Sequence, residues 1–257
     1  MKNYQWLWIT VFCFLTVGLT AQFNFGLKAG ASLSTSYGSP EKFNGQELES
    51  VALRPGYQVG LQTSYGLSEA FTLFGEVNFE HRVGVKQIQV GQTIPTQLGD
   101  VIVGVDAELT NKFSYLNVPI LAAYNTGNFQ VYAGPNFGYL LRTRTDRETV
   151  TTVSLPAELP ANTPGLPQAG TTNTEIDFIN DEAYEENGPY VNRFELGANI
   201  GLMYTLPNNL LLDLRLNHGI TDITNNDYDR SLIDQSPRSD SDRNVSIQFS
   251  VTYWLRN

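Results

Sequence analysis

Residues 193–219 read RFELGANIGLMYTLPNNLLLDLRLNHG, and this stretch decides the fold. Over 194–204 and again over 210–219, apolar side chains alternate with Gly, Asn or charged residues, which is the period of a β-strand. The intervening Pro207-Asn208-Asn209 is turn sequence. The stretch therefore predicts two antiparallel strands joined by a tight turn.

The same two-residue period recurs along the chain. It predicts eight strands, at about 23–35, 55–65, 71–83, 113–124, 129–144, 190–204, 210–219 and 244–255. The connections alternate between long and short, the long ones being 36–54, 84–112, 145–190 and 220–243. Short turns at one end and long loops at the other are typical of a barrel that spans a membrane.

The chemistry of the two strand faces favours a membrane barrel over a soluble one. One face is apolar and ends in aromatic residues, which include Tyr57, Tyr65, Tyr124, Tyr204, Tyr253 and Trp254. The other face holds small, amide and charged residues, which suit a narrow lumen. We therefore expect an all-β, eight-stranded antiparallel up-and-down transmembrane β-barrel with short periplasmic turns and long extracellular loops. A soluble, lipocalin-like periplasmic barrel is the alternative.

The first 21 residues have the pattern of an export signal. Lys2 precedes an apolar run from Trp6 to Leu19, and small residues follow up to Ala21. We expect residues 1–21 to be a signal peptide and 22–257 to be the barrel domain, located in the outer membrane. Cys13, in the signal, is the one cysteine of the chain, so we expect neither disulfides nor thiol chemistry in the exported part.

The overall charge excludes nucleic acid as the main partner. The formal net charge is -10, whereas binding to phosphate backbones requires a basic surface. Charged residues make up 16% of the chain and aromatic residues 12%, which argues against disorder. We predict no cofactor, and we expect outer-membrane lipid and lipopolysaccharide as the surroundings of the barrel.

Three stretches of the predicted strands resemble the PorT-like outer-membrane β-barrel family, also labelled porin-family proteins. They are Phe25–Gly30 (FGLKAG), Tyr115–Ile120 (YLNVPI) and Ala133–Leu141 (AGPNFGYLL). The resemblance implies an eight-stranded barrel in the outer membrane of a Gram-negative-type cell. One branch of that family assists a protein secretion system, so the resemblance also implies secretion machinery as a class of partner.

Nine charged residues fall on the face predicted to line the lumen. They are Lys28, Glu76, Glu80, Arg82, Arg142, Arg193, Glu195, Asp213 and Arg215. Charges of both signs in a narrow space of low dielectric constant favour mutual pairing. We therefore expect a lumen plugged by salt bridges, and a small diffusion pore is the alternative.

The long loops are the candidate binding segments. The loop 145–190 is acidic and rich in proline. One interpretation is a solvated, partly disordered loop, and the alternative is a segment that binds divalent cations or a surface or secretion-machinery protein. The loop 220–243 places Asn225, Asp227 and Asp229 at alternate positions, as at the start of a calcium-binding loop. It lacks the later Gly and the bidentate Glu, so the calcium pattern is incomplete.

Catalysis finds no support in the sequence. The two histidines, His81 and His218, both fall on the apolar face, and no G-x-S-x-G, metal triplet or phosphate loop is present. The sequence therefore predicts a non-enzymatic outer-membrane barrel that displays acidic loops for binding, envelope maintenance or assistance to secretion.

Overall fold

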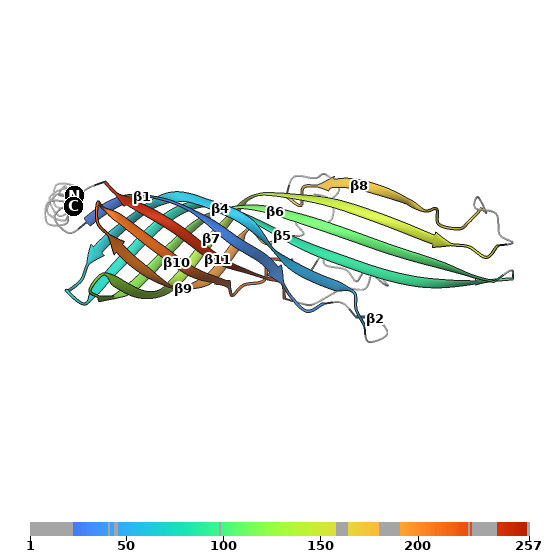
Figure 1. The fold of residues 1–257 in the computed structure, drawn as a ribbon, viewed down its shortest axis with the longest axis horizontal. Helices are drawn as coiled ribbons and strands as arrows, with labels where there is room; N and C mark the ends of the chain where they lie inside the picture. Colours follow the sequence, from blue (N-terminus) through green and yellow to red (C-terminus); the bar gives the residue numbers. More distant parts are fainter. Residues whose placement is uncertain are drawn as a thin grey trace, which may run out of the picture.

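The computed structural model describes residues 23–40, 42–43, 46–97, 99–157, 164–179, 191–225, 227 and 241–255. The predicted signal peptide, 1–21, lies outside the described residues. The described chain forms one barrel from which a narrower sheet extends at one end (Figure 1). Among the described residues, no helix is long and apolar enough to cross a membrane.

Eight antiparallel strands form the ring. They are β1 (Phe23–Tyr37), β4 (Glu49–Gly66), β5 (Phe71–Thr96), β6 (Gly99–Thr126), β7 (Phe129–Ser154), β9 (Phe194–Leu206), β10 (Leu210–Gly219) and β11 (Arg243–Trp254). The hydrogen-bonded order is β6-β5-β4-β1-β11-β10-β9-β7, and the β6–β7 pairing closes the ring. The predicted eight-stranded antiparallel barrel is confirmed. The short strands β2 (Lys42–Phe43) and β3 (Gln46–Glu47) pair with each other, and β8 (Gly170–Ile176) pairs with β7.

Tight turns gather at one end of the barrel, which we call the turn end. Asn208 and Asn209 join β9 to β10 with φ values of 62° and 64°, in the left-handed region that Asn tolerates better than most residues. Gly127, with φ 68°, joins β6 to β7. The described chain also begins and finishes here (Figure 1), where the Leu255 amide donates to the Phe25 carbonyl oxygen at 2.8 Å.

Three strands run much further than their predicted ends of 83, 113 and 144. β5 continues to Thr96, β6 begins at Gly99, and β7 continues to Ser154. The expectation that 84–112 is a loop is therefore wrong, because β5 and β6 stay paired from Gly84↔Asn111 to Thr96↔Gly99. Strand β8 adds to the β7 side, over Thr145–Thr151. We call this four-stranded sheet, which projects from the end opposite the turns, the extension (Figure 1).

The ring has an apolar outside and a polar inside. About half of the surface of outward side chains such as Leu27 (51%), Val59 (48%) and Phe249 (52%) is exposed, whereas the inward Gln58 and Gln62 are buried. On β7, the outward positions from Phe129 to Leu141 cover about 30 Å along the barrel axis, if the rise per residue is ~3.4 Å and the tilt ~40°. This matches the thickness of a bilayer's hydrocarbon core.

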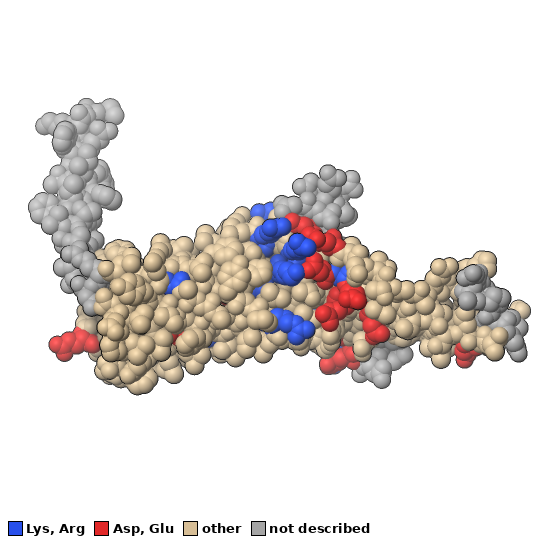
Figure 2. All heavy atoms as spheres, turned by 45° about the horizontal axis from the view of Figure 1, so that its top comes forward, with Lys and Arg blue, Asp and Glu red and all other residues tan. Residues whose placement is uncertain are grey.

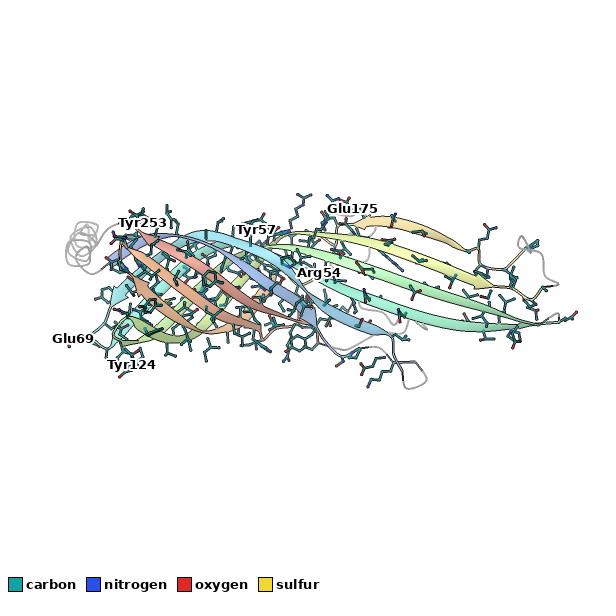
Figure 3. All side chains as sticks on the ribbon, viewed as in Figure 1. Arg54, Tyr57, Glu69, Tyr124, Glu175 and Tyr253 are labelled. Atoms are coloured by element: carbon teal, nitrogen blue, oxygen red, sulfur yellow. The ribbon has the colours of Figure 1, made fainter. Side chains whose placement is uncertain are left out.

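Tyrosines mark both ends of the apolar wall. Tyr124 and Tyr253 lie near the turn end and Tyr57 lies toward the other end (Figure 3), each with 50% of its surface exposed. Such positions suit the interface between lipid and water. Trp254 was expected in the same belt, and that expectation is wrong. Its ring packs against the buried Phe74, with centroids 6.4 Å apart, because the strand alternation turns it inward.

Candidate functional site

The lumen is filled with paired charges. The structure places seven of the nine predicted lumen residues inside the barrel, each with at most 3% of its surface exposed: Lys28, Glu76, Glu80, Arg82, Glu195, Asp213 and Arg215. They come from β1, β5, β9 and β10, where they occupy the inward positions of the two-residue alternation. They form two clusters.

The first cluster joins two cations to two carboxylates. Lys28 Nζ donates to Glu76 Oε1 at 2.9 Å and to Asp213 Oδ2 at 2.7 Å. The Arg215 guanidinium donates to both Glu76 oxygens, at 3.0 and 2.7 Å, and to Asp213 at 2.9 Å. The Tyr132 hydroxyl donates to Asp213 and accepts from Arg215 Nε at 2.9 Å. The cluster is formally neutral, and the bidentate pair fixes its geometry.

The second cluster has one cation for two carboxylates. Arg82 lies 3.0 Å from Glu80 and 2.9 Å from Glu195, and its guanidinium stacks over the Tyr115 ring at 4.9 Å. The cluster therefore carries a formal charge of -1. Side-chain amides supply the remaining donors, from Gln248 and Asn117 to Glu80 and from Asn244 to Glu195. Hydrogen bonds of this kind are what a buried carboxylate requires.

Apolar layers close the lumen on both sides of the charges. Toward the turn end, Phe74, Leu121 and Met203 pack with the rest of a buried cluster: Ala123, Tyr132 and Leu211. Toward the extension, Phe113, Tyr115, Leu140 and Val191 form a second cluster, against which Phe178 and Ile179 pack. Water and ions therefore meet an apolar layer from either side, as expected for a ring of eight strands, in which side chains fill the interior.

Two of the predicted lumen residues, Arg142 and Arg193, are exposed, and their placement in the lumen is wrong. In β7, Ser114 pairs with Arg142 whereas Tyr115 pairs with Leu140, so Leu141 is an extra residue in a β-bulge. Leu141 and Arg142 are both exposed, and Thr143 is buried instead. Arg193 lies in a bend before β9 begins at Phe194, so the strand alternation does not govern it. The charged residues that line the lumen are therefore three basic and four acidic ones, whereas five basic and four acidic ones were predicted.

A cavity of about 390 Å³ lies at the barrel mouth, below the extension. Its walls come from the ends of β1 and β4, the lower extension of β5 and β6, and Phe178, Val191 and Ile223. Phe113, Phe178 and Val191 also belong to the apolar layer above the lumen charges, so the cavity is a dead end. The two-residue alternation could have identified Tyr115 and Tyr132 as lumen residues. It could not have identified the cavity residues Phe178, Val191 and Ile223, because they lie in predicted loops or at the end of a predicted strand.

The calcium candidates form no recognisable ion site. The Asp227 amide donates to Asn225 Oδ1 at 3.3 Å, as in an ordinary polar turn. Asp229 lies outside the described residues. Within the part of the chain that the structure describes, no three His, Cys, Asp or Glu side chains gather as metal ligands would.

The histidines lie on the outer wall. His81 Nδ1 is 3.3 Å from Ser114 Oγ, and His218 Nε2 is 2.6 Å from the Tyr37 hydroxyl. A nucleophile activated by His requires a third group that orients the ring, and no carboxylate of the described chain forms an ion pair with either histidine.

Comparison with known families agrees with this architecture. Residues 19–225 match the family model described as outer membrane protein beta-barrel domain. The chain belongs to this family. It is a transmembrane barrel of the outer membrane, with its turn end on the periplasmic side and its extension outside the cell. The soluble alternative is therefore wrong. A search of curated proteins finds no match.

Several solved structures are similar to the chain at low sequence identity. The attachment invasion locus protein Ail of Yersinia pestis is 10% identical, covering 91% of this chain and 99% of its own, with a TM-score of 0.35. Neisserial surface protein A is 11% identical over 89% and 96%, with a TM-score of 0.38. The outer membrane protein W of E. coli is 13% identical over 91% and 98%, with a TM-score of 0.37.

Charged side chains form bands where this outer-membrane barrel meets its extension. Figure 2 shows Lys and Arg side chains next to the uncharged barrel wall, and Asp and Glu side chains beyond them. Arg144 pairs with Asp146 at 3.3 Å and with Glu175 at 2.8 Å. A hydrogen bond from Lys112, supported by Arg144, lowers the pKa of Asp146 below its ordinary value.

Proposed function

We propose that this protein is a non-conducting, non-enzymatic outer-membrane barrel that binds a partner at the cell surface through its extension. The observation that carries the proposal is the contrast between the two halves. The lumen is filled by paired charges between two apolar layers, whereas β5 to β8 form ordered sheet outside the barrel. A barrel built for diffusion would keep a water-filled interior.

The exposed edge of β8 supports a protein partner. Within the described chain, β8 pairs with β7 alone, and residues 170–175 are exposed. An exposed edge strand offers backbone donors and acceptors to an extended segment of another chain. A surface protein or a component of secretion machinery, as the PorT-like resemblance implies, fits this mode. Parts of the predicted binding loop 145–190, namely 158–163 and 180–190, lie outside the described residues.

Outer-leaflet lipid and lipopolysaccharide complete the proposed surroundings. The apolar wall contacts the hydrocarbon region, and the band of Lys and Arg in Figure 2 lies where anionic headgroups are expected. In this arrangement the barrel anchors and orients the extension. The barrel itself catalyses no reaction in this role.

Site-specific photo-crosslinking in intact cells tests the proposal. A crosslinking residue at Thr172, on β8, should give a discrete adduct with one protein partner. The matched control is the same residue at Val59, on the lipid-facing wall, which should give none. Adducts of equal pattern from both positions, or none from Thr172 in cells that contain the full envelope, would contradict the proposed surface role.

A further inference from the structure

The cavity at the extracellular mouth has the size and depth of a small-molecule site. Its volume of about 390 Å³ falls in the range of ligand pockets, which is ~300–1,000 Å³. It ends on the apolar layer that caps the lumen charges, so a molecule entering it from outside has no path onward. A cavity that is open to the outside and blocked at its inner end suits retention of a ligand.

The deep wall of the cavity is apolar and firmly held. Ile88, Phe113, Val191 and Ile223 are each no more than 8% exposed, and Phe178 packs against the buried cluster that contains Phe113 and Val191. These side chains come from β5, β6 and two connections, the one between β8 and β9 and the one between β10 and β11. The hydrogen bond from the Asn192 amide to the Ile223 carbonyl oxygen, at 2.8 Å, holds the two connections together. An apolar group entering here would lose its contact with water.

The polar side of the cavity is predominantly acidic. Glu47, Glu49 and Asp242 contribute three carboxylates, and Lys86 contributes the one ammonium group among the described lining residues. Lys86 pairs with Glu49 at 3.0 Å, and Glu47 pairs with Lys42, beyond the lining, at 3.3 Å. Together, these three carboxylates and the two ammonium groups of Lys86 and Lys42 carry a formal net charge of -1.

The position of Asp242 depends on a glycine. Thr224 Oγ1 donates to Asp242 Oδ2 at 2.9 Å. A Cβ atom placed on Gly38 would lie 1.9 Å from Asp242 Oδ1, so a side chain at position 38 would displace the carboxylate. The absence of a side chain at Gly38 thus lets the carboxylate lie against the backbone just after β1, at the cavity wall.

We propose that this cavity binds a small amphiphilic cation. Its apolar body packs against Ile88, Phe113 and Ile223, and its cationic group faces Asp242 and Glu49. The negative sum of the lining selects against an anionic head. The inference rests on the proposed binding role of the extracellular half, and it adds a ligand class that the edge of β8 does not require.

Three probes with one apolar body test the charge preference. They are naphthalene derivatives that carry a trimethylammonium, a hydroxymethyl or a sulfonate group. Their binding to the full-length protein in zwitterionic lipid nanodiscs is measured by fluorescence, with empty nanodiscs subtracted. The ammonium probe should bind about tenfold more tightly than the neutral probe, since one favourable charge contact contributes roughly a factor of ten. Equal affinities, or preference for the sulfonate, would overturn the proposal.

Matched variants locate the site. Ile223→Trp should fill the cavity and reduce binding of all three probes, whereas Leu216→Trp makes a similar change on the lipid-facing wall and should leave binding unchanged. Asp242→Asn and Glu49→Gln should each weaken binding of the ammonium probe about fivefold and leave binding of the neutral probe unchanged. The gel mobility of unheated samples shows whether each variant has folded. If Ile223→Trp does not fold, Asp242→Asn and Glu49→Gln still test the position of the site.

Two further outcomes would count against the site. Equal effects of Ile223→Trp and Leu216→Trp would show binding to lipid or wall, and loss of the neutral probe in Asp242→Asn would show collapse of the cavity. The Thr172 crosslinking experiment is independent of these measurements. Retained crosslinking with no probe binding would refute the cavity ligand alone, whereas lost crosslinking with probe binding would refute the surface partner alone.

Discussion

Single side chains in the lumen decide how strongly the barrel resists unfolding. Glu76 accepts hydrogen bonds from four residues of the lumen: Lys28, Arg215, Gln62 and Asn78. Replacing one partner of a buried ion pair leaves the other charge without compensation, which costs about 3–5 kcal/mol. Its four donors would then face a neutral amide.

We therefore expect Glu76→Gln to lower the free energy of unfolding by about 3 kcal/mol, measured by urea titration in lipid vesicles. Glu69→Gln is the matched control, because Glu69 is exposed in a turn at the periplasmic end (Figure 3). It should change stability by less than about 0.5 kcal/mol. A Glu76→Gln variant as stable as the parent would mean that the pairing contributes nothing net.

The two-residue alternation predicts correctly whether some lumen residues face inward, and it fails for others. Glu76, Asp213 and Arg215 lie inside, as the two-residue period predicts, because the pairing of β10 is regular throughout and that of β5 is regular around Glu76. Arg142 follows the bulge at Leu141, which no residue type in the sequence announces, and so it faces outward. One inserted residue reverses the inward and outward positions of everything that follows it.

At the scale of elements, the ring strands and the extension differ in how visible they are in sequence. The strand predicted over 210–219 coincides with β10, because one of its faces meets lipid and the other meets the lumen. Gly91, Gln92 and Thr93 in β5 are exposed in succession. This run interrupts the alternation in β5. In β6, however, Val101 and Val103 are buried on either side of the exposed Ile102, so part of the two-residue signal of the extension was present in the sequence and was not used.

Strand β8 should be the least protected of the longer strands against hydrogen exchange. Its described pairing is with β7 alone, whereas β10 is bonded to β9 on one side and β11 on the other. We expect β8 amides to exchange at least about a hundredfold faster than β10 amides, since edge strands open locally. Mass spectrometry of exchanged protein in nanodiscs measures this, with β10 as the internal standard. Equal protection would show that another contact covers the β8 edge.

The whole molecule should be electrically silent. Ions that enter from either side meet an apolar layer and then a lumen whose carboxylates and cations bind each other. Purified protein in planar bilayers should therefore show no steady conductance. Faster gel migration of the unheated sample serves as the control that the barrel is folded, because a closed ring of strands resists detergent. Large, reproducible openings from such folded protein would support the pore instead.

The seam between β1 and β11 has a consequence for assembly. Leu27 pairs with Tyr253, so the first strand of the ring in chain order has the last strand of the ring as one of its two neighbours. Until β11 arrives, β1 and β10 each present an open edge, and such edges invite pairing with other chains. Closure of the ring therefore waits for β11, and a chain truncated before Arg243 would leave an aggregation-prone open sheet in place of a barrel.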